Sequence, residues 1–118
     1  MRYMVMHYED DAMEAGEVPS AETIEAIGSF ITELSTSGVL LAGEGVGPSS
    51  QGARLTVNGN GHITVTDGPF AEAKELIAGF AILEVASKEE AIEYAKRWAK
   101  IAGVTKIDVR RVAEGPGN

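Results

Sequence analysis

The chain of 118 residues contains no cysteine, which excludes disulfide bonds, thiolate metal ligands and a cysteine nucleophile. It also has no run near the roughly 18 apolar residues that a membrane-spanning helix requires. The N-terminal sequence MRYMVMHYEDD has one arginine and an apolar run that is too short for a signal peptide. These absences predict a soluble cytoplasmic protein.

Positive charge is also scarce in this chain. Ten Lys and Arg residues stand against eighteen Asp and Glu residues, which gives a formal net charge of −8. A chain with this balance repels phosphate backbones and anionic lipids unless its basic residues gather in one patch. The basic residues are scattered instead, and the pair Arg110-Arg111 is more typical of a solvated face. We therefore expect no nucleic acid and no membrane as a partner.

The rest of the composition is that of an ordinary globular domain, with 44% hydrophobic and 24% charged residues. A chain of this length fits one domain with one hydrophobic core. Residues 1–118 are therefore predicted to form a single domain, and every motif must share its core.

Two segments have the apolar spacing and the end signals of amphipathic helices. The first follows Ser20, a good N-cap residue, and ends at Gly38. The second follows the capping box Ser87-Lys88-Glu89-Glu90 and ends at Gly103. Both are predicted to bury one face.

Strand signals occupy most of the remaining chain. Residues 2–8, 39–45, 77–85 and 106–112 are apolar or alternating runs of strand length. The sequence Asn58-Gly59-Asn60-Gly61 predicts the tip of a hairpin between strands at 54–58 and 62–66, because Asn and Gly accept positive φ angles. Segments 9–19 and 48–53 have loop composition.

The order of these elements predicts an α+β fold of the ferredoxin-like βαββαβ type with an extra β-hairpin. Two helices would cover one face of an antiparallel sheet. The strands are apolar on both faces, so the second sheet face also needs a cover. A second copy of the chain provides it most simply, which predicts a homodimer in which two sheets face one another.

The stretch TDGPFAEAKELIAGF, residues 66–80, interrupts the strands. Pro69 has the φ angle of a first helical residue, Gly68 permits an unusual turn, and Asp67 can accept hydrogen bonds from later amides. This interpretation predicts a short helix at 69–75. It does not explain why a helix should stand in a connection between strands.

Three strings with fixed spacing, LLAGEG (40–45), PSSQGAR (48–54) and TDGPFAEAKELIAGF (66–80), together resemble the YCII-related superfamily and its DGPF-domain group. The similarity continues through SKEEAIEYAKRWA (87–99) and IDVRRV (107–112), so it covers nearly the whole chain. The resemblance implies a dimeric α/β barrel of ferredoxin-like subunits. In YCII-like proteins an enzymatic role is suspected from a His–Asp pair in a cleft, and DGPF-group members often resemble proteins encoded beside extracytoplasmic-function sigma factors.

His7 and Asp67 are the candidate catalytic residues. His7 lies near the end of the first strand, and Asp67 follows the hairpin strand, so both could open onto a cleft between the sheet and the hairpin. An aspartate can orient an imidazole and tune its pKa toward neutral pH, as a general base requires. The structural alternatives are a packed histidine with one hydrogen bond and an aspartate that stabilises a turn.

Three further residues are candidates for substrate binding. Arg54 and Lys74 could hold an anionic group, although each could equally form an ordinary surface interaction. Glu44 stands between Gly43 and Gly45, where either a ligand or a neighbouring strand could come close.

Metal and cofactor sites are not expected. His7 with Glu9, Asp10 and Asp11 offers nitrogen and oxygen ligands, but three consecutive acidic side chains cannot all point one way. The chain has no G-x-S-x-G elbow, no P-loop and no dinucleotide fingerprint. We predict neither a metal nor a bound cofactor.

These residues predict a small-molecule cleft with acid–base chemistry on a small polar or anionic substrate. The first alternative is a non-catalytic binding or regulatory module, with a possible link to an extracytoplasmic-function sigma factor. In the second alternative the DGPF turn has only a structural role in closing the dimer.

Overall fold

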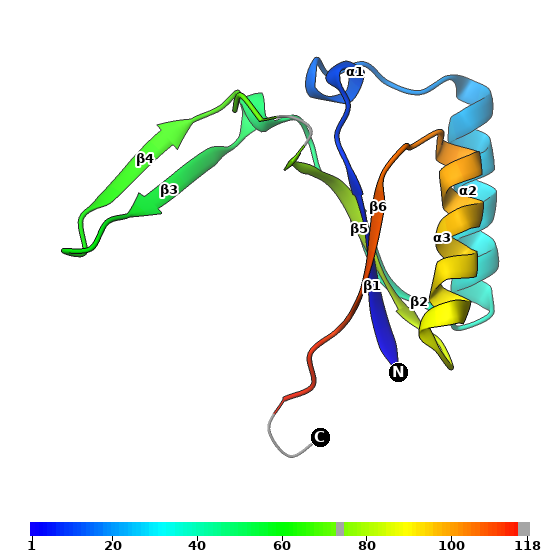
Figure 1. Cartoon of the computed structure of the whole chain (residues 1–118). Helices are drawn as coiled ribbons and strands as arrows, with labels where there is room; N and C mark the ends of the chain where they lie inside the picture. The colour runs from blue at the N-terminus through cyan, green and yellow to red at the C-terminus, as the bar shows by residue number, and fades with distance from the viewer. Residues whose placement is uncertain (73–74, 116–118) are drawn as a thin grey trace.

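The computed structural model describes residues 1–72 and 75–115 as a mixed α+β fold with antiparallel sheets (Figure 1). Its elements, in chain order, are β1 (Arg2–Tyr8), α1 (Asp11–Glu14), α2 (Ala21–Thr36), β2 (Leu40–Gly45), the 3-10 helix η1 (Ser49–Gln51), β3 (Ala53–Val57), β4 (Ile63–Asp67), β5 (Ile77–Glu84), α3 (Lys88–Ala102) and β6 (Ile107–Arg111). The six predicted strands and the two long helices are confirmed.

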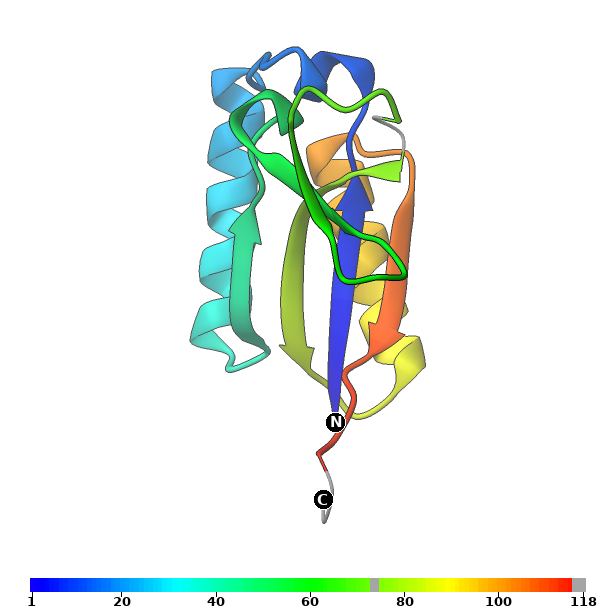
Figure 2. The ribbon, with the colours of Figure 1, turned by 90° about the vertical axis from the view of Figure 1, so that its left-hand side faces the viewer.

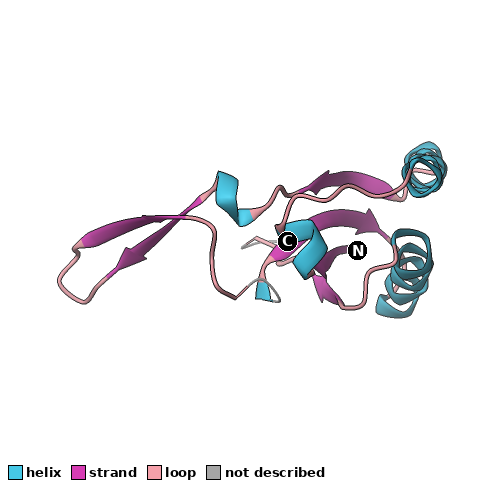
Figure 3. Ribbon diagram, turned by 90° about the horizontal axis from the view of Figure 1, so that it is seen from above, coloured by secondary structure: helices cyan, strands magenta, loops and turns pink. Residues whose placement is uncertain are grey.

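The main sheet has four antiparallel strands in the order β2-β5-β1-β6. Helices α2 and α3 cover one face of this sheet, and no described helix covers the other (Figures 1 and 3). The core lies between the sheet and the two helices, and its buried residues are Tyr3, Val5, Phe30, Leu34, Leu83, Val85, Ala91 and Ala95.

Both long helices begin and end where the sequence predicts. The Ser20 side chain accepts a hydrogen bond from the amide of Thr23, and Ser87 accepts one from the amide of Glu90. Helix α3 ends at Gly103, whose φ of 70° is left-handed and suits glycine. These caps satisfy amides that would otherwise lack a partner at each helix start.

Strands β3 and β4 form a separate antiparallel hairpin that pairs with neither edge of the main sheet in the described structure. The hairpin extends away from the body of the molecule (Figures 1 and 2). At its tip the Asn58 side chain accepts hydrogen bonds from the amides of Asn60 and His62, and Gly61 has a φ of 85°. We call this hairpin, residues 53–67, the arm.

Two segments predicted as loops contain helical turns. Helix α1 begins where Asp10 accepts from the amide of Met13, at 2.8 Å, and Ser49 begins the 3-10 helix η1. The expected helix at 69–75 is wrong for residues 69–72, which are not helical. Residues 73–74 lie outside the described structure, and of the described residues in this range Glu75 alone has 3-10 helical conformation, with its amide donating to the carbonyl of Glu72 at 2.9 Å. The amide of Phe70 donates to the Ser49 hydroxyl at 2.8 Å, so it is not available to Asp67 as a capping amide.

Among the described residues, no helix has the length and apolarity needed to cross a membrane.

Candidate functional site

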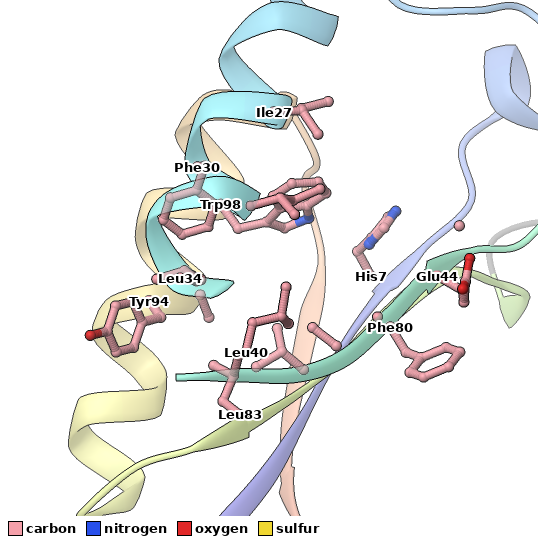
Figure 4. Close-up of a pocket in the computed structure, with 16 residues that line it drawn as sticks. His7, Ile27, Phe30, Leu34, Leu40, Glu44, Phe80, Leu83, Tyr94 and Trp98 are labelled. Carbon is pink, nitrogen blue, oxygen red and sulfur yellow. The ribbon is translucent and has the colours of Figure 1, made fainter. Parts of the chain in front are cut away.

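A cavity of about 410 Å³ lies between the main sheet and helices α2 and α3 (Figure 4). Strands β1, β2 and β5 supply one wall, and the two helices supply the other. Most of the lining is apolar and includes Phe30, Leu34, Leu40, Leu83 and Trp98. Among the lining residues, His7, Glu44, Tyr94 and, through its indole N–H, Trp98 have side chains with polar groups.

His7 is the polar group placed most directly on the cavity wall. It follows Tyr3 and Val5 on the helix-facing side of β1, and its ring centroid lies 5.6 Å from that of Trp98. Figure 4 shows the indole of Trp98 extending toward the imidazole. Partial burial lowers the pKa of His7 below its ordinary value of 6.5, so the imidazole is neutral at neutral pH.

Within residues 1–72 and 75–115, no protein group forms a hydrogen bond with the His7 imidazole. A neutral imidazole carries one N–H donor and one nitrogen acceptor. Both groups are therefore available to a molecule in the cavity.

Gly79 provides the space that the imidazole occupies. It pairs directly with His7 in the sheet register. A Cβ atom at position 79 would lie 2.5 Å from Cε1 of His7 and 3.1 Å from the carbonyl oxygen of Glu44. A glycine inside a strand can mark such a close approach, and this signal is visible in the sequence IAGF.

Replacing Gly79 with alanine is expected to displace the His7 ring. The three nearest atoms to the new methyl group are two ring atoms of His7 and the backbone carbonyl oxygen of Glu44, and the ring can move more easily than the backbone. We expect a changed His7 pKa, read by NMR titration, and a loss of about 1–2 kcal/mol in unfolding free energy. Gly45→Ala is the matched control, since Gly45 lines the same cavity and a Cβ there meets nothing within 4 Å. An unchanged His7 titration in the Gly79 variant would contradict this assignment.

Glu44 on β2 is also among the residues that line the cavity, but it pairs with Phe80, which pairs with Met6, so its side chain lies on the helix-free face of the sheet (Figure 4). Its side chain is exposed. The preceding Gly43 has a structural explanation, because a Cβ there would lie 3.2 Å from the carbonyl oxygen of Phe80 on the paired strand. His7 and Glu44, two of the predicted site residues, are thus both among the lining residues, but their side chains lie on opposite faces of the sheet.

The structure does not bring Asp67 or Arg54 into this cavity. Asp67 is exposed at the end of β4 and is not part of the described lining. The guanidinium of Arg54 lies 4.3 Å from the Phe70 ring centroid and forms an ion pair with Glu72, the ordinary surface interaction foreseen for it. Lys74, the remaining predicted site residue, lies outside the described residues.

The DGPF turn is attached to the body of the protein through Ser49. The Ser49 hydroxyl accepts from the amide of Phe70, and the Ser49 amide and hydroxyl donate to the Glu14 carboxylate at 2.6 and 2.8 Å. This chain of hydrogen bonds joins the turn, η1 and α1, which are far apart in sequence. It gives the motif a structural role that is separate from the cavity.

No cluster of three or more His, Asp and Glu side chains suited to a metal ion occurs within residues 1–72 and 75–115. The acidic run separates as its sequence suggests. Glu9 is buried with 5% of its surface exposed, whereas Asp10 caps α1.

Sequence reasoning did not assign a site role to Trp98 or Tyr94, which line the helix side of the cavity. Trp98 was visible only as part of the apolar face of a helix. Nothing in that periodicity distinguishes a core residue from a residue that lines a cavity.

Comparison with known proteins gives a family match and one short similarity. A model of the YCII-related domain matches residues 1–113. A protein of Rhizobium meliloti (strain 1021), itself described as uncharacterized, is 47% identical over 36 residues, which is 30% of this chain. The match spans 29% of that protein's length.

Proposed function

The chain belongs to the YCII-related domain family, and from this premise we propose that it is a homodimer that binds a small molecule between its sheet and helices. We place it in the DGPF-domain group, with ferredoxin-like subunits that form a dimeric α/β barrel. The antiparallel order β2-β5-β1-β6, with the arm inserted between β2 and β5, supports this proposal. The uncovered sheet face supports the dimer.

The observation that carries the binding proposal is a neutral imidazole, without a hydrogen-bond partner among the described residues, in the wall of a largely apolar cavity of about 410 Å³. Small-molecule pockets are typically about 300–1,000 Å³ and combine apolar walls with a few polar groups. The apolar lining suits a ligand with an apolar body. One polar group of that ligand would reach His7.

The charge around the cavity favours a neutral or cationic polar group over an anion. The described lining of the cavity contains no Lys or Arg, and the chain carries a formal net charge of −8. Arg54, the cation expected to hold an anion, is paired with Glu72 outside the cavity. The sequence predicts a small polar or anionic substrate, and of these two a polar ligand without negative charge fits this geometry better.

For the chemistry, we propose that His7 acts as a general base. Its pKa lies below 6.5 because burial disfavours the charged ring, so the free nitrogen can accept a proton at neutral pH. The Glu44 carboxylate lies on the opposite face of the sheet and is not placed to contact the resulting imidazolium. In this proposal His7 acts without the Asp67 partner predicted from the sequence.

The test uses Trp98, the only tryptophan of the chain, as an internal reporter of cavity occupancy. Uncharged and cationic metabolites are screened for a shift in Trp98 emission and for a raised melting temperature, because a ligand that binds the folded state stabilises it. His7→Gln is expected to weaken a hit by about 10- to 100-fold through loss of a buried hydrogen bond. His62→Gln, which changes the exposed histidine of the arm, is expected to bind normally. Equal affinity in both variants would refute a role for His7.

The non-catalytic alternative is favoured by one observation. No described residue hydrogen-bonds to His7, whereas a catalytic imidazole is usually oriented by a partner on its second nitrogen. If NMR shows that a His7-dependent ligand remains chemically unchanged after prolonged incubation, the protein is a binding or regulatory module. A partner such as an extracytoplasmic-function sigma factor would then be sought with the ligand present.

A further inference from the structure

One face of the arm carries four adjacent apolar side chains that nothing in the described structure covers, next to the pair Ala53 and Asp67 at its base. In the hairpin register Leu55 pairs with Val65, and Val57 pairs with Ile63, so these four side chains share one face. We call them the arm stripe. Between 53% and 62% of the surface of each is exposed. The opposite face carries the pair Thr56 and Thr64.

The shape of the molecule shows that the arm stands apart from the core. The radius of gyration is 16.3 Å, whereas a compact domain of this length is expected to have about 13.5 Å. Isolated two-stranded hairpins are at best marginally stable in water. The arm therefore needs a surface to cover its stripe.

The arm stripe is not the only uncovered apolar surface. The two central strands of the helix-free sheet face carry Met4 and Met6 on β1 and Ile82 on β5, all partly exposed. The outer strands add Glu44, Asp108 and Arg110 to the same face. Figures 1 and 2 show that the arm projects from this same side of the molecule. A second copy related by a two-fold axis presents the same two surfaces, the arm stripe and the helix-free sheet face, to the first copy. A single symmetric dimer contact can therefore cover both surfaces on both subunits.

The charge distribution favours a second copy over an oppositely charged partner. Residues 55–66, LTVNGNGHITVT, contain no Lys, Arg, Asp or Glu in a chain that is 24% charged. Two copies with a net charge of −8 each repel one another over most of their surfaces. The uncharged arm can approach a second copy without that cost.

We infer that the arm is an exchange element: the arm stripe of each subunit packs against the second copy, next to its helix-free sheet face. This inference rests on the homodimer proposed above and identifies the segment that holds it together. The association is reciprocal, so each dimer contains two such contacts.

The test replaces the cross-strand pair Leu55 and Val65 with Lys and Glu. Opposite charges on directly paired strands preserve the hairpin, whereas they are unfavourable in an apolar contact. The matched control is Thr56→Lys with Thr64→Glu, the same charges on the opposite face of the same hairpin. Amide NMR signals of the arm verify that the hairpin is formed in both variants.

Analytical ultracentrifugation gives the dimer dissociation constant of each protein. We expect the Leu55/Val65 variant to dimerise at least about 100-fold more weakly than wild type, and the Thr56/Thr64 variant to remain within about threefold. A Leu55/Val65 variant with wild-type affinity would overturn the exchange. In that case the variant Met6→Glu, which places a charge on the helix-free sheet face, tests the homodimer separately. If Met6→Glu abolishes dimerisation, the homodimer forms through the sheet face and only the role of the arm is refuted. A wild-type protein that is monomeric throughout would overturn both proposals.

Discussion

Gly68→Ala is expected to destabilise the protein by about 2–4 kcal/mol, because its methyl group would occupy the position of a backbone atom. A Cβ at position 68 would lie 1.7 Å from the carbonyl oxygen of Ser49 and 2.5 Å from its carbonyl carbon. A backbone segment cannot rotate away as a flexible side chain can. The turn must therefore separate from η1.

That separation removes several hydrogen bonds at once. The amide of Gly68 donates to the carbonyl of Gly52 at 3.0 Å, and the amide of Phe70 donates to the Ser49 hydroxyl. Ser49 is itself buried and donates to Glu14. Each buried polar group left without a partner costs about 1–3 kcal/mol, which gives the magnitude stated above.

The control for Gly68→Ala is Gly52→Ala. Gly52 lies in the same contact and has an extended backbone with φ of −123°, but a Cβ there would be 3.7 Å from the Ser49 carbonyl. We expect this variant to stay within about 0.5 kcal/mol of wild type, since alanine also reduces the entropy of the unfolded chain. Urea denaturation at neutral pH measures both. If the two variants unfold alike, the close packing of Gly68 on Ser49 is not a source of stability.

This contact gives a physical reason for the glycine of the DGPF turn. The glycine is required by the backbone of Ser49, and the amide of the phenylalanine is held by the same residue. Asp67 itself is exposed and lies outside the cavity lining. The motif therefore connects the base of the arm to the body, which is where an exchange element needs a firm attachment.

Local patterns were sufficient to predict the strands and both long helices. Ser20 and Ser87 were correct as N-caps because capping depends on side chains within three residues of the helix start. The hairpin tip followed in the same way from Asn58 and its neighbours. Each of these features is stabilised by contacts that are close in sequence.

The errors occur where a distant residue decides the local structure. The helix expected after Asp67 is not formed at 69–72 because Phe70 donates to Ser49, which lies 21 positions earlier. Helix α1 was missed, and its Glu14 is held by the same Ser49, 35 positions later. A single sequence gives no signal for either contact.

The candidate site was predictable in part for the same reason. His7 and Glu44 were identified from their own strands, and the sheet order then places both on one cavity. The proposed partnership with Asp67 depended on the direction of the arm, which no local pattern specifies. Asp67 ends β4 at the base of the arm and is not among the described residues that line the cavity.

Glu9 is the second position where a large effect is expected. Its side chain is 5% exposed, and its Oε2 atom has no hydrogen-bond partner among the described residues. Burial raises the pKa of Glu9 above its ordinary value of 4.5, and the nearby carboxylates of Glu14 and Asp10 raise it further. A buried, ionised carboxyl group beside like charges is a cost to the folded state at neutral pH.

The sign of the pH dependence follows from this raised pKa. The folded protein binds the Glu9 proton more tightly than the unfolded chain does. The stability that the protonated group provides is fully present below pH 4.5, and it is lost as the pH rises through the folded pKa. His7 acts in the opposite direction, because its lowered pKa makes the folded protein lose stability as the pH falls below 6.5.

Glu9→Gln keeps the shape of the side chain and removes its ionisation. We expect the variant to be more stable than wild type by about 1–2 kcal/mol at pH 8, the size of the penalty for burying an uncompensated polar group. Below pH 4.5 this difference should vanish or reverse, because Glu9 is then protonated in both the folded and the unfolded wild-type protein.

Urea denaturation of wild type and Glu9→Gln from below pH 4.5 to pH 8 gives the difference between their free energies of unfolding. The contribution of His7 is the same in both proteins, so it cancels in this difference. Glu17→Gln, which removes an exposed carboxylate nearby, controls for the change in net charge and should give a nearly constant offset. A Glu9→Gln curve that runs parallel to wild type would show that Glu9 does not titrate differently on folding. A curve that diverges from wild type as the pH rises would show that Glu9, at the junction of β1 and α1, lowers the stability of the folded protein when it is ionised. From the sequence alone this carboxyl group would be expected in solvent.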